Sequence, residues 1–326
     1  MKTFRNLARI SLLLCLVVVV LGAWVRLTDA GLGCPDWPGC YGKMLVPTGE
    51  RAEIASAAFP ERPLEHGKAW REMIHRYAAG MLGLLVLAMA AIAWRRRREP
   101  DQPVKVPLFL AGLIVFQSLL GMWTVTLLLK PAIVTLHLLG GMATLALLTW
   151  LSLPSYTRQP GGGRMFRRLG VLALAVVTLQ IALGGWVSTN YAALSCPDFP
   201  RCQGQWWPTM DFRSGFQPWH GLGVDYEGGI LHNSARVAIH VTHRIGAVIA
   251  LLVIGFAALW ARRHAPSPAG RLAGATVGVA LLAQVLLGIV MVKMSLPLWI
   301  AVAHNGLAAV LLASIINLNK VAWRAN

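Results

Sequence analysis

Four of the nine histidines lie inside long apolar stretches and recur along the chain in the same order. His75 has a counterpart at His243, and His137 has one at His304. An ionisable side chain within a membrane span is costly, so a functional site is its default interpretation. Two imidazoles at one depth on facing helices of a four-helix bundle can ligate a haem iron from both sides.

The alternative for each histidine is a hydrogen bond to a neighbouring helix. A lone intramembrane histidine would favour that alternative, but duplication and matched depth favour two haem positions, His75 with His137 and His243 with His304. Zinc is less favoured, because its sites draw three or four close ligands and each half repeats only two histidines.

An internal repeat organises the chain around these histidines. Trp24-Val25 and Cys34-Pro-Asp-Trp-Pro-Gly-Cys40 return as Trp186-Val187 and Cys196-Pro-Asp-Phe-Pro-Arg-Cys202. Gln117 with Leu119-Leu120-Gly121 returns as Gln284 with Leu286-Leu287-Gly288. The sequence therefore predicts two halves, 1–157 and 158–326. With four spans each, both halves insert in the same direction, as in a parallel repeat.

The elements that position the histidines are apolar runs of about 20 residues, long enough to cross a bilayer. With 56% hydrophobic and 13% charged residues, the chain is not an ordinary soluble domain. We predict an all-α integral membrane protein with eight transmembrane helices as two repeated four-helix bundles. The predicted spans are 9–27, 72–94, 106–129, 131–152, 166–188, 236–260, 271–293 and 298–318.

Charge predicts the orientation of these spans. More than half of the 30 Lys and Arg residues fall on one side, and all acids except Glu99 and Asp101 fall on or near the other. The positive-inside rule then predicts that both termini lie in the cytoplasm. No Arg- and Ser-rich transit peptide precedes the first span, so we expect a bacterial inner membrane and not a mitochondrial one. The net charge of +17 reflects this topology, and nucleic-acid binding is disfavoured. Two long outer segments, 28–71 and 189–235, are expected to fold as caps.

Arginines directly follow two of the repeated histidines. Arg76 and Arg244 could bind haem propionates, because guanidinium presents a planar fork to a carboxylate. They could equally snorkel to the outer interface. Lys130, at a span end, is expected to snorkel.

Together, these motifs resemble those of haem A synthase over essentially the whole chain. The residues that carry the resemblance are Glu72-Met-Ile-His75-Arg76, Leu136-His137, Thr242-His243-Arg244, Ala303-His304-Asn305 and the two Cys-Pro-Asp loops. The resemblance implies oxidation of the C8 methyl of haem O to a formyl group, with a b-type haem in the other half. It also implies haem O synthase and cytochrome oxidase assembly factors as partners, and it allows a homo-oligomer.

The repeat breaks beside the first histidine pair, where Glu72 stands opposite its counterpart His240. A carboxylate there could handle protons or stabilise positive charge on an oxidised methyl. We therefore expect haem O between His75 and His137, and haem b between His243 and His304. The alternative makes Glu72 an acid in the first helical turn, where the helix dipole favours it.

Four of the five cysteines lie in the two loop motifs on the predicted outer side, where disulfides form. Cys34–Cys40 and Cys196–Cys202 are the natural pairings, each worth about 2 kcal/mol as a staple. A redox role for the first pair stays open. The remaining Cys15 is expected to pack within its span.

Three other function classes compete with the synthase. A di-haem b-type electron carrier would use the same histidines without needing Glu72. A quinone-linked thiol oxidase would explain the cysteines but not the histidines. A transporter would suit the parallel repeat, yet the ionisable residues cluster near the outer edge and not at the midplane.

Overall fold

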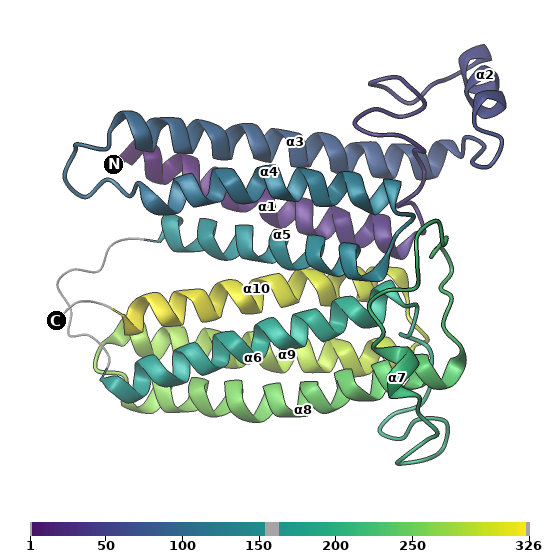
Figure 1. The fold of residues 1–326 in the computed structure, drawn as a ribbon. Coiled ribbons are helices and arrows are strands. Elements are labelled where there is room, and N and C mark those ends of the chain that lie inside the picture. Colours follow the sequence, from purple (N-terminus) through teal and green to yellow (C-terminus); the bar gives the residue numbers. More distant parts are fainter. Residues whose placement is uncertain (1, 154–162, 324–326) are drawn as a thin grey trace.

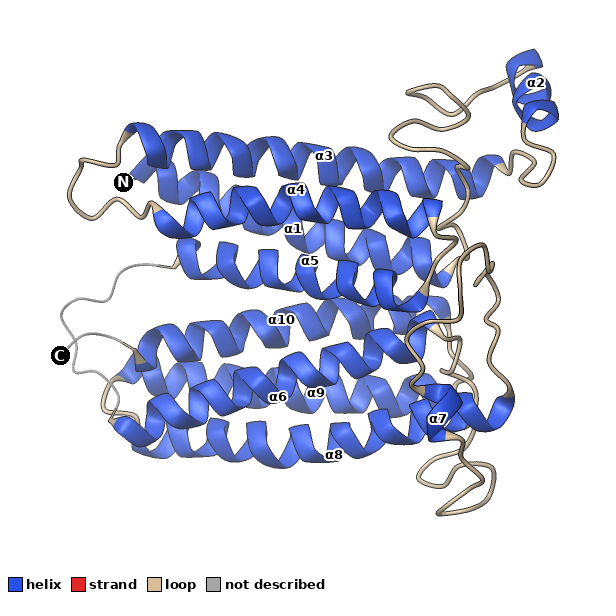
Figure 2. Ribbon diagram, viewed as in Figure 1, coloured by secondary structure: helices blue, strands red, loops and turns tan. Residues whose placement is uncertain are grey.

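The computed structural model describes residues 2–153 and 163–323, which fold into helices joined by turns and loops (Figures 1 and 2). Within these residues only two isolated β-bridges occur and no strand forms. Eight helices are long and apolar enough to cross a membrane, as predicted. They are α1 (Lys2–Leu27), α3 (His66–Arg95), α4 (Lys105–Thr126), α5 (Pro131–Ser152), α6 (Arg164–Thr189), α8 (Asn233–His264), α9 (Pro268–Lys293) and α10 (Leu298–Ala322).

Several helix ends differ from the predicted spans. The 30 residues of α3 extend for roughly 45 Å, whereas the hydrocarbon core of a bilayer is about 30 Å thick. Its first turns, from His66, contain the charged residues Lys68 and Arg71, so a search for apolar runs missed them. The helix α4 stops at Thr126 because Leu128 and Leu129 adopt positive φ values of 50° and 58°. These leucines form a turn before Pro131, although their hydropathy suits a span.

The spanning helices lie in two groups (Figure 1). In the first group α1 packs on α3 and α5, and α4 packs on the same two helices. In the second, α8 and α10 each pack on α6 and α9. The groups meet where α10 contacts α1 and α5, and where α5 contacts α6. The predicted boundary between residues 157 and 158 lies outside the described residues.

The two ends of the bundle are unlike. Residues 28–65 and 190–232 form long segments at one end, which we call the loop-bearing end (Figure 1). The first includes the short helix α2 (Glu50–Ala58), and the second includes α7 (Phe212–Gly215). We call these segments the first and second caps.

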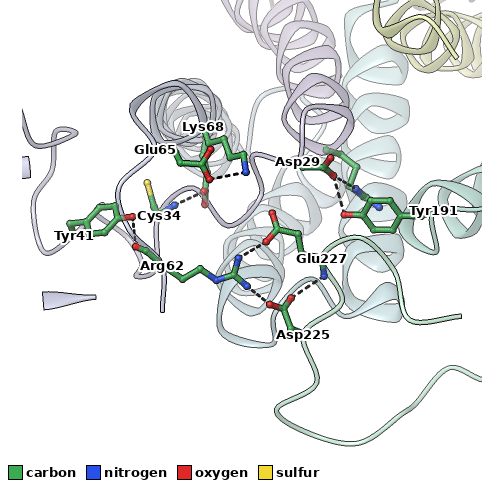
Figure 3. Close-up of polar contacts among 11 residues, drawn as sticks. Asp29, Cys34, Tyr41, Arg62, Glu65, Lys68, Tyr191, Asp225 and Glu227 are labelled. Carbon is green, nitrogen blue, oxygen red and sulfur yellow. Dashed lines mark hydrogen bonds and ion pairs between the residues drawn. The ribbon is translucent and has the colours of Figure 1, made fainter. Parts of the chain in front are cut away.

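The caps are tied to each other. The guanidinium of Arg62 in the first cap is forked between the carboxylates of Asp225 and Glu227 in the second (Figure 3). Near the other edge of the same view, the Tyr191 hydroxyl donates to Asp29 at 3.0 Å. These contacts support the expectation that both segments fold as caps.

Candidate functional site

A cavity of about 720 Å³ lies among the helices of the first group. His75 and Glu72 of α3 line it, and His137 of α5 lines it as well. Arg76 lines it too, so the structure brings together all four catalytic and haem-binding residues predicted for the first half. Helices α6 and α10 complete the wall through Ser188 and Asn305, among others. The volume is in the usual range for small-molecule sites.

Each of the four repeated histidines places the Cε1 edge of its ring against a glycine of a neighbouring helix. A Cβ added to the glycine would lie 3.1 Å from Cε1 in three cases and 3.5 Å in the fourth. Such closeness brings the ring onto the helix backbone, and at the three shorter contacts a methyl group would have to displace it. The pairs are His75 with Gly22, His137 with Gly121 (3.5 Å), His243 with Gly184, and His304 with Gly288.

These glycines follow the same repeat as the histidines, and the sequence reasoning gave them no role. A signal was present, because Gly121 and Gly288 close the repeated Leu-Leu-Gly motif. The positions of Gly22 and Gly184, two residues before the repeated Trp-Val, were a second signal. Only the helix packing shows which histidine each glycine faces.

The ring nitrogens fit the demands of a metal ligand. The Nδ1 atoms of His75, His137 and His304 are buried and have no hydrogen-bond partner among the described residues. His243 Nδ1 lies 3.1 Å from Gln180 Nε2, and Gln284 Nε2 lies 3.2 Å from His304 Nε2. Each ring keeps one nitrogen that no described protein group uses, although buried polar atoms are normally paired.

The predicted pairs also match the ligand number of a haem site better than that of zinc. No three His, Cys, Asp or Glu side chains gather as an ion site within residues 2–153 and 163–323. Haem iron needs only two axial protein ligands, since the porphyrin supplies the others.

Glu72 is buried, with 4% of its surface exposed. Its Oε2 accepts the Cys34 backbone N–H at 2.9 Å, and its Oε1 pairs with Arg76. Because α3 begins at His66, Glu72 lies beyond the first turn, and the alternative of a helix-dipole role in that turn is wrong. The carboxylate is instead fixed between the first cap and the cavity.

His240, the counterpart of Glu72, is buried and makes a different contact. Its Nδ1 lies 2.9 Å from the carbonyl oxygen of Ala192, where α6 gives way to the second cap. Both positions therefore connect a spanning helix to a cap, but only the first carries a carboxylate. His243, and not His240, has a glycine opposite its ring.

The two cysteine loops are built alike. Cys34–Cys40 and Cys196–Cys202 are disulfide-bonded, as predicted. Asp36 accepts the N–H groups of Tyr41 and Gly42, as Asp198 accepts those of Gln203 and Gly204. The N–H groups of Gly204 and Gln203 lower the pKa of the Asp198 carboxyl. Cys15 is a free, buried cysteine, and it also lines the cavity.

Arg76 of α3 and Arg244 of α8 bind these two loops. Arg76 donates to the carbonyls of Asp36, Pro38 and Gly39, besides pairing with Glu72. Arg244 donates to the carbonyls of Cys196, Asp198 and Arg201, at 2.8 to 2.9 Å. Each guanidinium thus donates hydrogen bonds to its cysteine loop. This role differs from the two that were predicted, propionate binding and snorkelling.

Comparison with known proteins agrees along nearly the whole chain. Residues 5–316 match the model of the COX15-CtaA family, described as cytochrome oxidase assembly protein. The chain is 44% identical to the haem A synthase of Shewanella oneidensis, over 97% of this chain and 96% of that one. Identity to the haem A synthase of Novosphingobium aromaticivorans is 30%, over 91% and 88% of the two chains. For that of Halalkalibacterium halodurans it is 27%, over 81% and 76%.

Proposed function

Because the chain belongs to the cytochrome oxidase assembly family that contains the haem A synthases, we propose that its cavity binds haem O and that it oxidises the C8 methyl to a formyl group. Family membership confirms the haem A synthase activity predicted from the sequence. The di-haem carrier and the thiol oxidase are accordingly not favoured. Haem O is the substrate, and the enzyme is a membrane oxidoreductase.

The proposal assigns one haem to each half. Haem O lies between His75 and His137 in residues 1–157, and a b-type haem lies between His243 and His304 in residues 158–326. The equivalent glycine contacts of all four rings support two equivalent ligand pairs. Histidine-ligated haem supplies one-electron chemistry when it is bound.

The shape of the cavity supports haem O as its occupant. Charged side chains, Arg26, Glu72 and Arg76, line it toward the loop-bearing end. Deeper in the bundle the wall is largely apolar and includes Cys15, Leu82 and Leu84. Haem O carries two carboxylates at one edge and a long isoprenoid side chain at another. A cavity that is polar at one end and apolar at the other matches both.

The side chains of the first half have distinct tasks in this proposal. His75 and His137 centre the porphyrin between α3 and α5. The Cys34 N–H and Arg76 hold Glu72 in place at the cavity wall. A carboxylate fixed in advance beside the substrate can accept a proton or stabilise developing positive charge without reorganising.

The orientation follows from charge and from the disulfides. We propose that the loop-bearing end faces the oxidising outer side of a bacterial inner membrane, where disulfides persist. The basic residues of the opposite end then lie in the cytoplasm, with both termini. Haem O synthase as the source of substrate and cytochrome oxidase assembly factors as neighbours remain predictions.

The observation that carries the proposal is the convergence of His75, His137 and Glu72 on one cavity. Its test measures conversion of haem O to haem A in membranes that contain the chain as their only haem A synthase. His75→Ala and His137→Ala should reduce conversion to background, because the substrate loses an axial ligand. His264→Ala, an exposed histidine at the far end of α8, is the control and should convert normally. Normal conversion by both cavity variants would refute the proposal.

A further inference from the structure

Arg26 is a cation in the cavity wall for which no role was predicted. It belongs to the last turn of α1 and follows Gly22 by one turn, roughly 6 Å along the helix. Gly22 faces the ring of His75, so Arg26 lies between that histidine and the loop-bearing end. Only 15% of its side chain is exposed.

The surroundings hold the guanidinium in position but leave donors free. Arg26 donates to the carbonyl of Ser188 at 2.5 Å and lies over the ring of Tyr191, 4.1 Å from its centroid. The nearest carboxylate, Asp29, is 3.5 Å away, is half exposed, and also accepts the Tyr191 hydroxyl (Figure 3). Solvent weakens this ion pair from the side of the half-exposed Asp29 carboxylate, although Arg26 itself is largely buried. Of five N–H donors in a guanidinium, one makes a hydrogen bond to the described part of the chain.

Other cations near this end are differently placed. Arg76 uses its donors on the first cysteine loop and on Glu72. Arg71 contacts the Thr28 carbonyl at 3.4 Å and does not line the cavity. The repeat counterpart of Arg26 is Ser188, so the second half has no cation at this position. Arg26 is therefore a feature of the first half alone.

We propose that Arg26 is the carboxylate-binding residue of the cavity and holds a propionate of haem O. The inference rests on the proposed function and adds an orientation to it. The planar fork of arginine matches a carboxylate, and a charge-assisted hydrogen bond is strong in a largely buried site. With one propionate at Arg26, the porphyrin directs its isoprenoid chain into the deeper apolar part of the cavity.

Two forms of one ligand test this inference. Purified full-length protein is titrated with haem O and with its dimethyl ester, and binding is followed by the shift of the Soret band. Wild-type protein should bind the free acid about tenfold more tightly than the ester, as expected for a hydrogen bond to a charged group. Arg26→Gln should lose about tenfold for the acid and nothing for the ester. Arg71→Gln, the matched control, should leave both affinities unchanged.

Equal losses for acid and ester in Arg26→Gln would overturn the inference, because Arg26 would then only shape the cavity. An unchanged affinity for the acid would overturn it too. Should this variant fail to accumulate, Arg26→Lys is used instead, because it keeps the charge but lacks the planar fork. Arg26→Lys should show a smaller preference for the acid over the ester. An undiminished preference would contradict the assignment. His137→Ala distinguishes failure of the proposed haem O site from failure of the Arg26 assignment, since it should weaken the binding of both the acid and the ester. If it weakens neither, the proposed function fails.

Discussion

Each repeated histidine lies with one ring edge against a glycine, and this contact fixes how far the ring stands from the neighbouring helix. The histidines themselves were predictable, since an ionisable side chain in an apolar span stands out and duplication pairs it with a partner. Their glycines were not, because a glycine in a membrane helix is common. Its role depends on which helix lies opposite.

Gly288→Ala should disturb the second haem site. The added methyl would lie 3.1 Å from His304 Cε1 and must push the ring aside. We expect less bound haem B, or a shifted electron paramagnetic resonance spectrum of the remaining low-spin haem, since that spectrum depends on the orientation of the axial rings. Gly278→Ala in the same helix is the control, because its methyl would make an ordinary 3.9 Å contact with Ala258. Identical spectra and haem content in both variants would remove the proposed role of Gly288.

Glu72→Gln keeps the size of the side chain but removes its charge and its capacity to accept a proton. Folding and haem B in the second half should survive. If Glu72 acts in catalysis, the variant should accumulate haem O or a partly oxidised alcohol, which chromatography of extracted haems would detect. Wild-type rates of haem A formation would reduce Glu72 to a contact that holds the first cap through Cys34. His240→Ala should be milder, because His243 and His304 remain as ligands.

Arg76 and Arg244 show where local sequence stops being informative. Their place beside the histidines was visible, and two roles were considered. The carbonyls that they bind belong to residues about 40 positions earlier, in loops whose path no spacing rule predicts. Whether either residue also reaches a propionate stays a prediction.

Among the elements, the disulfide loops are the best predicted part of the caps. Each loop combines a disulfide with an aspartate that accepts two backbone N–H groups and an arginine that binds loop carbonyls. The cysteine spacing and the repeat were enough to pair the sulfurs. The supporting hydrogen bonds were not foreseen, because they depend on the turn that follows each aspartate.

Replacement of both Cys196 and Cys202 by Ser should cost about 2 kcal/mol of stability, the value expected for a lost staple in so short a loop. Thermal unfolding in detergent and haem retention would report the loss. Some turnover should remain, because neither cysteine lines the cavity of the first half. Free thiols at both positions in native protein, isolated with a thiol-trapping reagent, would contradict a structural disulfide.

The second cap reaches across to the first helix group. Lys130 is buried, with its amine 2.9 Å from the Gly221 carbonyl, and Leu128 accepts a hydrogen bond from the Tyr226 N–H at 3.1 Å. The snorkelling predicted for Lys130 is therefore wrong. It was assigned from distance to the span end alone, and the covering segment comes from 91 residues further along the chain.

At the scale of the whole molecule, the bilayer explains why hydropathy predicted the eight spans. Every backbone group in a lipid environment must be paired within a helix, so an apolar run of sufficient length has little other choice. The helix ends were less predictable, as the Leu128 and Leu129 turn illustrates. The cavity could not be predicted from the sequence, because its volume depends on side chains from six helices that pack together.

The most direct test of the account identifies the haems bound by purified wild-type protein, His137→Ala and His304→Ala. Chromatography of the extracted porphyrins should give haem B together with haem O or haem A from the wild type. His304→Ala should lose haem B, since one of its axial ligands is gone, whereas His137→Ala should keep haem B and lose the substrate haem. Haem B alone in the wild type, or undiminished haem B in His304→Ala, would contradict the assignment of one haem to each half.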